Sequence, residues 1–100
     1  MALSIEEKEN LLKSIHVDWE LNHIHTRLKR RVKLKQMVEP VKIANLIAVL
    51  AAKEWHHPEL RIGFGYLEVE IWTHTENDVV ENDFKFASKV DEILKREVNL

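Results

Sequence analysis

The sequence predicts an α+β domain in which a four-stranded antiparallel sheet carries three helices packed on one face. Helix and strand periodicities alternate along the chain in the order helix, two strands, helix, two strands, helix. Strands that come in pairs between helices are typical of an antiparallel sheet covered by helices. The composition agrees, because 45% hydrophobic residues with two Gly and two Pro describe one compact domain, which we expect to comprise residues 1–100.

The first helix is predicted over residues 5–13. Ser4 and Glu7 have the spacing of a capping box, in which each side chain accepts a hydrogen bond from the other residue's backbone N–H. Apolar and polar residues then alternate with the strand period of two over 15–21, and along 24–34 the apolar parity is reversed. Two strands joined by a tight turn explain this change of parity.

The second of these strands carries the most basic feature of the chain. Five cations share the parity opposite to its apolar residues: Arg27, Lys29, Arg31, Lys33 and Lys35. We interpret the row as the solvated face of an edge strand, on which charge protects against aggregation. The alternative is a surface for nucleic acid or another polyanion, which the net charge of −2 does not favour.

A second helix is predicted over residues 41–55. Pro40 precedes it, and a proline is tolerated in the first turn of a helix because its missing N–H would have no partner there. The segment is apolar on almost every side, which predicts burial on more than one face. We expect one face to pack on the sheet. Another face, together with the sheet edges, is expected to join subunits into a homo-oligomer, a dimer or a tetramer.

Two further strands and a third helix complete the pattern. Apolar residues share one parity over 60–66 and the other over 67–71, with two glycines near the change. This predicts a third and a fourth strand, or one strand pair with a sharp bend. The last helix shows apolar residues at spacings of three and four, and Asn77 or Asp78 is expected to cap it.

Composition also excludes several classes of function. Without cysteine there is no disulfide framework, thiol nucleophile or thiolate metal site. The sequence has no glycine-rich phosphate loop and no Gly-x-Ser-x-Gly elbow. The N-terminal residues include early acidic side chains and lack the apolar stretch of a signal peptide, and no stretch approaches membrane-spanning length. We therefore expect a cytoplasmic protein with no membrane partner.

The sharpest local feature is the pair His56 and His57, which lies between a helix end and Pro58. Proline restricts the residue before it to extended conformations, so these two imidazoles would be preorganised for acid/base chemistry near neutral pH. The alternative is a solvated pair at the helix C-terminus. His74 ends the last apolar alternation on the face opposite the core, where it is either a site residue or an ordinary surface residue. Asp83 would either stabilise the last helix or orient an imidazole.

These residues together resemble the pterin-4a-carbinolamine dehydratase family. They occur along residues 19–94 in the family's order and spacing: Trp19, His56-His57-Pro58, Phe64, Thr73-His74 and Asp83. The resemblance implies the α+β subunit described above and assembly into a homotetramer. It also implies a lyase that converts 4a-hydroxytetrahydropterin into quinonoid dihydropterin, a step of tetrahydrobiopterin recycling.

The resemblance further implies a role for each residue. His56 and His74 would form the acid/base pair, His57 would bind and orient the pterin, and Asp83 would support an imidazole. Three aromatic residues would contact the substrate: Trp19, Trp55 and Phe64. Neither a metal nor an organic cofactor is expected, and two adjacent histidines with a distant third also match a catalytic zinc site poorly.

Two positions depart from the family's pattern. Ala52 lies four residues before the first histidine of the pair, where family members usually have a charged or hydrogen-bonding residue, and this bears on activity. Val79-Val80 replaces the usual Leu-Thr step before the aspartate helix, so that helix must be capped by another group. The second candidate function is a non-catalytic oligomeric binding protein, because animal members of the family also act as dimerisation cofactors of a homeodomain transcription factor.

Overall fold

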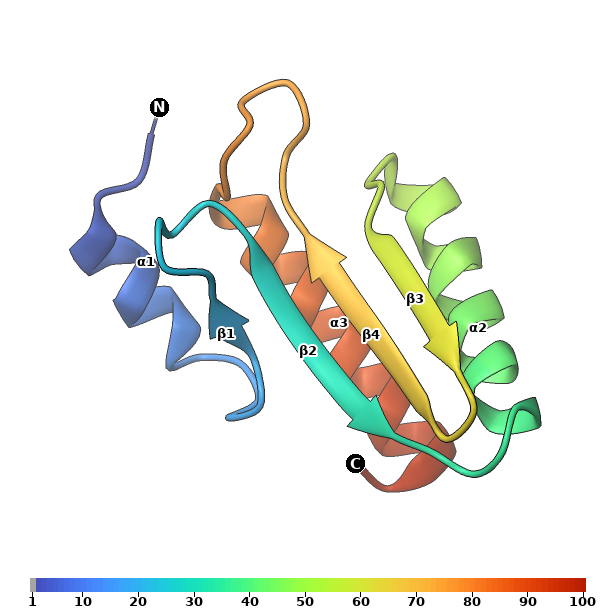
Figure 1. Cartoon of the computed structure of the whole chain (residues 1–100). Helices are drawn as coiled ribbons and strands as arrows, with labels where there is room; N and C mark the ends of the chain where they lie inside the picture. The colour runs from blue at the N-terminus through green and yellow to red at the C-terminus, as the bar shows by residue number, and fades with distance from the viewer. Residues whose placement is uncertain (1) are drawn as a thin grey trace.

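The computed structural model describes residues 2–100 and confirms the predicted α+β class and order of elements (Figure 1). The elements are α1 (Ile5–Leu12), β1 (Glu20–Leu21), β2 (Leu28–Lys33), α2 (Val38–Glu54), β3 (Glu59–Gly63), β4 (Tyr66–Ile71) and α3 (Glu81–Val98). The strands form one antiparallel sheet in the order β1-β2-β4-β3. In Figure 1, α2 and α3 lie behind this sheet, while α1 lies beyond β1 and contacts α3. No helix within residues 2–100 is both long and apolar enough to cross a membrane.

The core lies between the sheet and the helices α2 and α3. The sheet contributes alternate residues of its two central strands: Leu28, Val32, Leu67, Val69 and Ile71. The helices contribute residues spaced three and four apart: Ile43, Ile47, Ala51, Phe86, Ala87, Val90 and Leu94. Burial of an aliphatic or aromatic side chain stabilises the folded state by ~1.5–3 kcal/mol relative to exposure, so this layer holds the sheet and the helices in one body.

The predicted capping box at the start of α1 is confirmed. Ser4 Oγ accepts from the Glu7 N–H at 3.1 Å, and a Glu7 carboxylate oxygen accepts from the Ser4 N–H at 2.8 Å. Lys8 of the same helix is buried and donates to Asp78 Oδ1 at 2.7 Å and to the His25 carbonyl oxygen at 2.7 Å. The hydrogen bond from Lys8 holds the pKa of Asp78 below its ordinary value. α1 is thereby attached to the segment that leads into α3.

The first strand is much shorter than the sequence predicts. Alternation over 15–21 predicts a strand, but only Glu20–Leu21 pairs with β2. The residues before it form turns that bond to α3. Trp19 is buried and its Nε1 donates to Asp91 Oδ1 at 2.7 Å, and the His16 N–H donates to Asp91 Oδ2 at 3.0 Å. Bonds to a helix thus replace the strand ladder that the alternation alone predicts.

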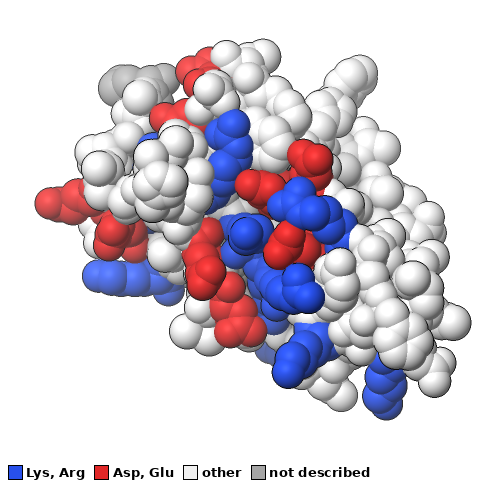
Figure 2. Space-filling view, viewed as in Figure 1, with Lys and Arg blue, Asp and Glu red and all other residues white. Residues whose placement is uncertain are grey.

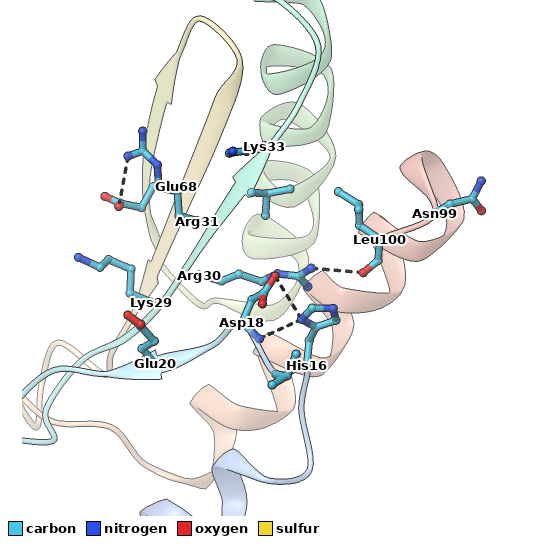
Figure 3. A pocket seen from close by; sticks show the side chains of 12 residues that line it. His16, Asp18, Glu20, Lys29, Arg30, Arg31, Lys33, Glu68, Asn99 and Leu100 are labelled. Carbon is cyan, nitrogen blue, oxygen red and sulfur yellow. Dashed lines mark hydrogen bonds and ion pairs between the residues drawn. The ribbon is translucent and has the colours of Figure 1, made fainter.

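A buried ion pair joins β2 to α3. Arg30 has the parity of the core residues of β2 and is only 2% exposed. Its Nη1 donates to Asp91 Oδ1 at 2.6 Å. Its Nη2 donates to the main-chain oxygen of Leu100 at 3.2 Å, and Figure 3 shows this second contact. Asp91 therefore accepts from Arg30, from the Trp19 indole and from the backbone before β1. The sequence analysis singled out neither partner of this ion pair.

The predicted row of cations lies on the open face of the sheet, but the interpretation as an edge strand is wrong. β2 lies between β1 and β4, and acidic residues of β4 lie beside its cations. Arg31 pairs with Glu68 at 3.8 Å, and Lys29 is opposite Glu70 in the register. Arg61 of β3 bonds to both glutamates, and its hydrogen bond lowers the pKa of Glu68. Figure 2 shows the resulting mixture of basic and acidic groups on this face.

α2 buries one face within the subunit and exposes another, whereas its apolar composition predicts burial on more than one face. The helix begins at Val38, which places Pro40 in the first turn. Its buried residues are Pro40, Ile43, Ala44, Ile47 and Ala51. Three of its valines are exposed, and they are Val38, Val41 and Val49. Contact of this exposed face with another subunit remains a prediction.

The prediction that Asn77 or Asp78 caps the last helix is wrong. Val80 occupies the N-cap position of α3 with extended backbone angles, and Asp83 Oδ2 accepts from the Val80 N–H at 2.7 Å. Asn77 lies in the preceding turn with a positive φ of 50°, and Asp78 is engaged by Lys8. A side chain from the first turn therefore satisfies the free N–H, and its negative charge suits the positive end of the helix dipole.

Candidate active site

The predicted histidines meet at one end of the sheet, where three elements end or begin. His56 and His57 follow α2, His74 follows β4, and Asp83 lies in the first turn of α3. β3 and β4 are antiparallel neighbours, so the segment entering β3 lies beside the segment leaving β4. A pocket of about 260 Å³ occurs there, lined by Trp55, His56, His57, Trp72, Thr73, His74 and Thr75.

His56 is fixed by a buried carboxylate. Its Nε2 lies 2.5 Å from Asp83 Oδ1, and the Asp83 side chain is fully buried. Asp83 Oδ2 also accepts from Thr73 Oγ1 at 2.9 Å, in addition to the Val80 N–H. The imidazole stacks on Phe86, with ring centroids 4.9 Å apart and planes inclined by 12°. Packing on one face and a hydrogen bond at one edge leave the ring a single orientation.

His74 is held by a stack and by one hydrogen bond. Its ring centroid lies 4.4 Å from that of Trp72 with an interplanar angle of 22°. Its Nε2 lies 3.0 Å from the carbonyl oxygen of His57. The His57 ring approaches the His74 ring edge-on, with centroids 6.5 Å apart and planes at 80°. The three imidazoles therefore belong to one site.

The hydrogen bonds determine which ring nitrogens remain free. A carbonyl oxygen only accepts, so the Nε2 of His74 carries a proton and its Nδ1 has no such bond. An ionised carboxylate likewise only accepts, so the Nε2 of His56 donates to Asp83. Each neutral ring thus has Nδ1 left to accept a proton. This is an arrangement suited to acid/base chemistry on a molecule placed between the two histidines.

Two of the predicted substrate contacts do not lie at this pocket. Trp19 is 2% exposed and bonded to Asp91 in the core, so its ring is not available to a ligand there. Phe64 is exposed in the turn between β3 and β4, at the opposite end of these strands from the histidines. Trp55, by contrast, lines the pocket and is 85% exposed.

Three residues of the site were given no role by the sequence analysis, although Thr73 belongs to its motif. Thr73 bonds to Asp83, Phe86 stacks on His56, and Trp72 stacks on His74. The sequence did contain a signal for Trp72. It lies two positions before His74, and residues two apart in an extended segment share a face. Ala52, the departure from the family's pattern, is exposed on the last turns of α2 and brings no polar side chain to the pocket.

Two other features were compared with the histidine pocket. Within residues 2–100, no three His, Asp or Glu side chains converge so as to hold a metal ion. A second hollow, about 920 Å³, lies beside β1 and β2 and is lined by side chains of both charges (Figure 3). It contains His16 but none of the histidines that the sequence analysis assigned to chemistry.

Comparison with known proteins identifies the family of the chain. A model of the family described as pterin 4 alpha carbinolamine dehydratase matches residues 1–93. A Methylococcus capsulatus protein named "Putative pterin-4-alpha-carbinolamine dehydratase" is 44% identical over 92 residues, which cover 91% of this chain and 79% of that protein. A Legionella pneumophila protein of the same name is 37% identical over 93 residues, covering 93% and 82% of the two chains.

Solved structures show the same fold. A crystal structure described as a transcriptional coactivator/pterin dehydratase from Brucella melitensis superposes with a TM-score of 0.85 at 28% identity, covering 93% of this chain and 98% of that one. A pterin dehydratase-like protein described as a RuBisCO assembly factor of the alpha-carboxysome has a TM-score of 0.64 at 20% identity, over 78% and 90% of the two chains, and shows the fold alone. By the family match and the identity to its relatives, the chain belongs to the pterin 4 alpha carbinolamine dehydratase family.

Proposed function

We propose that this protein dehydrates 4a-hydroxytetrahydropterin to quinonoid dihydropterin in the cytoplasm, with His56 and His74 as its acid/base pair. The observation that carries the proposal is the convergence of both imidazoles on one pocket, each with Nε2 engaged and Nδ1 free. Membership of the family supplies the substrate class.

The reaction needs one proton donated and one removed. The carbon–oxygen bond breaks while an acid protonates the leaving oxygen, which departs as water. A base takes the proton from a ring nitrogen, and the electron pair of that N–H bond forms the new double bond between nitrogen and carbon. His56 suits the acid role, because the buried Asp83 carboxylate stabilises a positive charge on its ring. His74 then acts as the base through Nδ1.

The other lining residues would hold the pterin between these two groups. His57 contributes a ring that is edge-on to His74, and its carbonyl oxygen fixes the His74 ring. Trp55 offers a flat apolar surface at the rim of the pocket. Correct placement of a reactant between acid and base supplies much of an enzyme's rate enhancement.

The test is the rate of dehydration of chemically generated 4a-hydroxytetrahydropterin, followed by rapid-mixing absorbance. We expect the protein to accelerate the reaction, and His56→Ala or His74→Ala to lose about 100-fold to 10,000-fold of the acceleration, the usual contribution of a positioned acid or base. His23→Ala is the matched control, because His23 is exposed and does not line the pocket. A folded protein with no acceleration would refute the proposal.

Trp55 provides a separate prediction, because its backbone is strained. It ends α2 with a positive φ of 54°, a conformation that favours glycine. Trp55→Gly is expected to raise the free energy of unfolding by roughly 0.5–1 kcal/mol, since relief of strain exceeds the added entropy of the unfolded chain. It should also raise KM about 10-fold through loss of ring stacking. Trp55→Phe, which retains a ring, should leave KM near the wild-type value, and equal KM values in all three proteins would exclude this contact.

The second candidate function is that of an oligomeric binding protein, and the exposed valines of α2 favour it. On this helix face, Val49 is 62% exposed and Val38 is 76% exposed. An exposed apolar face of this kind is suited to contact with another subunit or protein. By sedimentation we expect a dimer or tetramer of the 11.8 kDa chain. Val49→Glu should reduce it to a monomer, while Lys13→Glu, at an exposed position after α1, should not. A monomeric wild-type protein would contradict this assembly.

A further inference from the structure

We propose that Arg27 is a positioning residue for His74 and acts through Trp72. Arg27 is absent from the lining of the pocket, so it would not touch the substrate. Its Cζ lies 4.4 Å from the centroid of the Trp72 ring, and the other neighbour of that ring is His74. The catalytic consequence of this contact rests on the proposed function, whereas the contact itself does not.

The register of the sheet places Trp72 between the two residues. Leu28 pairs with Ile71, so Arg27 is the residue across from Trp72 on the neighbouring segment. His74 lies two residues further along the same segment as Trp72. A guanidinium that lies within ~6 Å of an indole is attracted to the face of the ring, and this attraction favours the ring orientation on which His74 stacks. Arg27 and His74 therefore both determine the orientation of one side chain.

Arg27 also binds the turn that carries His74. Its Nη2 donates to Asn77 Oδ1 at 2.6 Å, and its Nη1 donates to the Thr26 carbonyl oxygen at 2.8 Å. The Asn77 N–H in turn donates to the His74 carbonyl oxygen at 3.2 Å. One guanidinium thus contacts both the ring on which His74 stacks and the side chain of Asn77, whose backbone N–H bonds to the His74 carbonyl oxygen.

This double contact matters because His74 has few other constraints. It is an exposed residue with a single hydrogen bond from its ring, whereas His56 has a buried carboxylate and a stacked phenyl ring. A shift of ~1 Å in a catalytic group costs about 100-fold in rate. We therefore expect the precision of His74 to depend on Trp72, and that of Trp72 to depend on Arg27.

The chain provides a matched control, because Arg31 of β2 has the same parity as Arg27, which directly precedes that strand. Arg31 also lies over an aromatic ring, with its Cζ 3.9 Å from the centroid of Tyr66. Tyr66 begins β4, whereas Trp72 follows the end of that strand, so the Arg31 contact lies at the end remote from the histidines. Arg31→Met removes a cation–π contact of the same kind without affecting the pocket.

The first experiment measures kcat and KM for Arg27→Met and Arg31→Met. Arg27→Met should lower kcat by about 10-fold to 100-fold with KM changed less than about 2-fold, because the acid/base geometry changes and the binding surfaces do not. Arg31→Met should match the wild type. In a His74→Ala background, Arg27→Met should have no further effect, since it acts through that ring. An undiminished effect there would overturn the inference.

The second experiment is independent of activity. The stacked indole shifts the NMR signals of the His74 ring protons, and Trp72→Leu identifies that shift by abolishing it. We expect Arg27→Met to reduce the shift and Arg31→Met to preserve it. If the protein is inactive but Arg27→Met reduces the shift, the proposed reaction fails while the positioning role stands. If Arg27→Met leaves both kcat and the shift unchanged in an active protein, the positioning role is refuted.

Discussion

Asp83→Asn is expected to lower the rate of pterin dehydration by about 100-fold to 10,000-fold. The substitution preserves shape but removes the negative charge beside His56, whose Nε2 lies 2.5 Å from Asp83 Oδ1. An amide can also present its NH2 group to the ring, which would select the wrong tautomer. Both effects act on the protonated imidazole that the proposed mechanism requires. The measurement is the rapid-mixing rate per folded molecule, with the folded fraction determined by circular dichroism.

Asp78→Asn is the matched control for this prediction. Asp78 lies in the segment between β4 and α3, shortly before Asp83, and it bonds to Lys8 rather than to a histidine. We expect this variant to lose stability and to retain the wild-type rate per folded molecule. Equal rate losses in the two variants would show that the region tolerates no loss of charge and would remove the special role of Asp83.

Asp91→Ala is expected to lower the free energy of unfolding by about 3–5 kcal/mol, because it leaves a buried charge unpaired. Arg30 is 2% exposed and has its guanidinium 2.6 Å from Asp91. The Trp19 indole and the His16 N–H lose the same acceptor. A loss of this size is a large part of the stability of a small domain. Urea denaturation of the variant and the wild type measures the difference.

Two further variants test the cause of that loss. Asp18→Ala removes an exposed carboxylate from the same region and should change the free energy of unfolding by less than about 0.5 kcal/mol. The double variant Arg30→Met with Asp91→Leu removes both charges, and it should recover much of the loss because no unpaired ion remains. A double variant as unstable as Asp91→Ala would show that the bonds to Trp19 and His16, rather than the ion pair, dominate.

Local patterns in the sequence predicted most of the fold correctly. The capping box of Ser4 and Glu7, the apolar helix after Pro40 and the parity change before β4 all depend on neighbours within a few positions. The errors occurred where distant residues decide the structure. Most of residues 15–21 form turns that are bonded to Asp91 instead of a strand. The local alternation of apolar residues gives no sign of this distant partner.

The candidate site was predicted in the same uneven way. The motif residues His56, His57 and His74 do meet, together with Asp83. They meet because the segment between α2 and β3 and the segment between β4 and α3 lie at the same end of the sheet. Spacing in a motif records order along the chain and not distance, and Phe64 accordingly lies at the opposite end of the strands from the pocket. The contacts of Arg27 depend on register across two strands, which the sequence does not specify.

The hydrogen bonds that Asp83 makes to His56 and to the start of α3 have a consequence for the evolution of such chains. Its carboxylate bonds to His56 and also accepts from the N–H at the start of α3, and Val80 has no side-chain oxygen that could replace it. A descendant that abandoned the chemistry would still be selected to retain an acceptor at this position. His74 makes no comparable contribution to folding, so it would drift once selection for turnover ceased. The aspartate alone is therefore expected to mark common ancestry, whereas the aspartate together with His74 is expected to mark lineages that retain the proposed reaction.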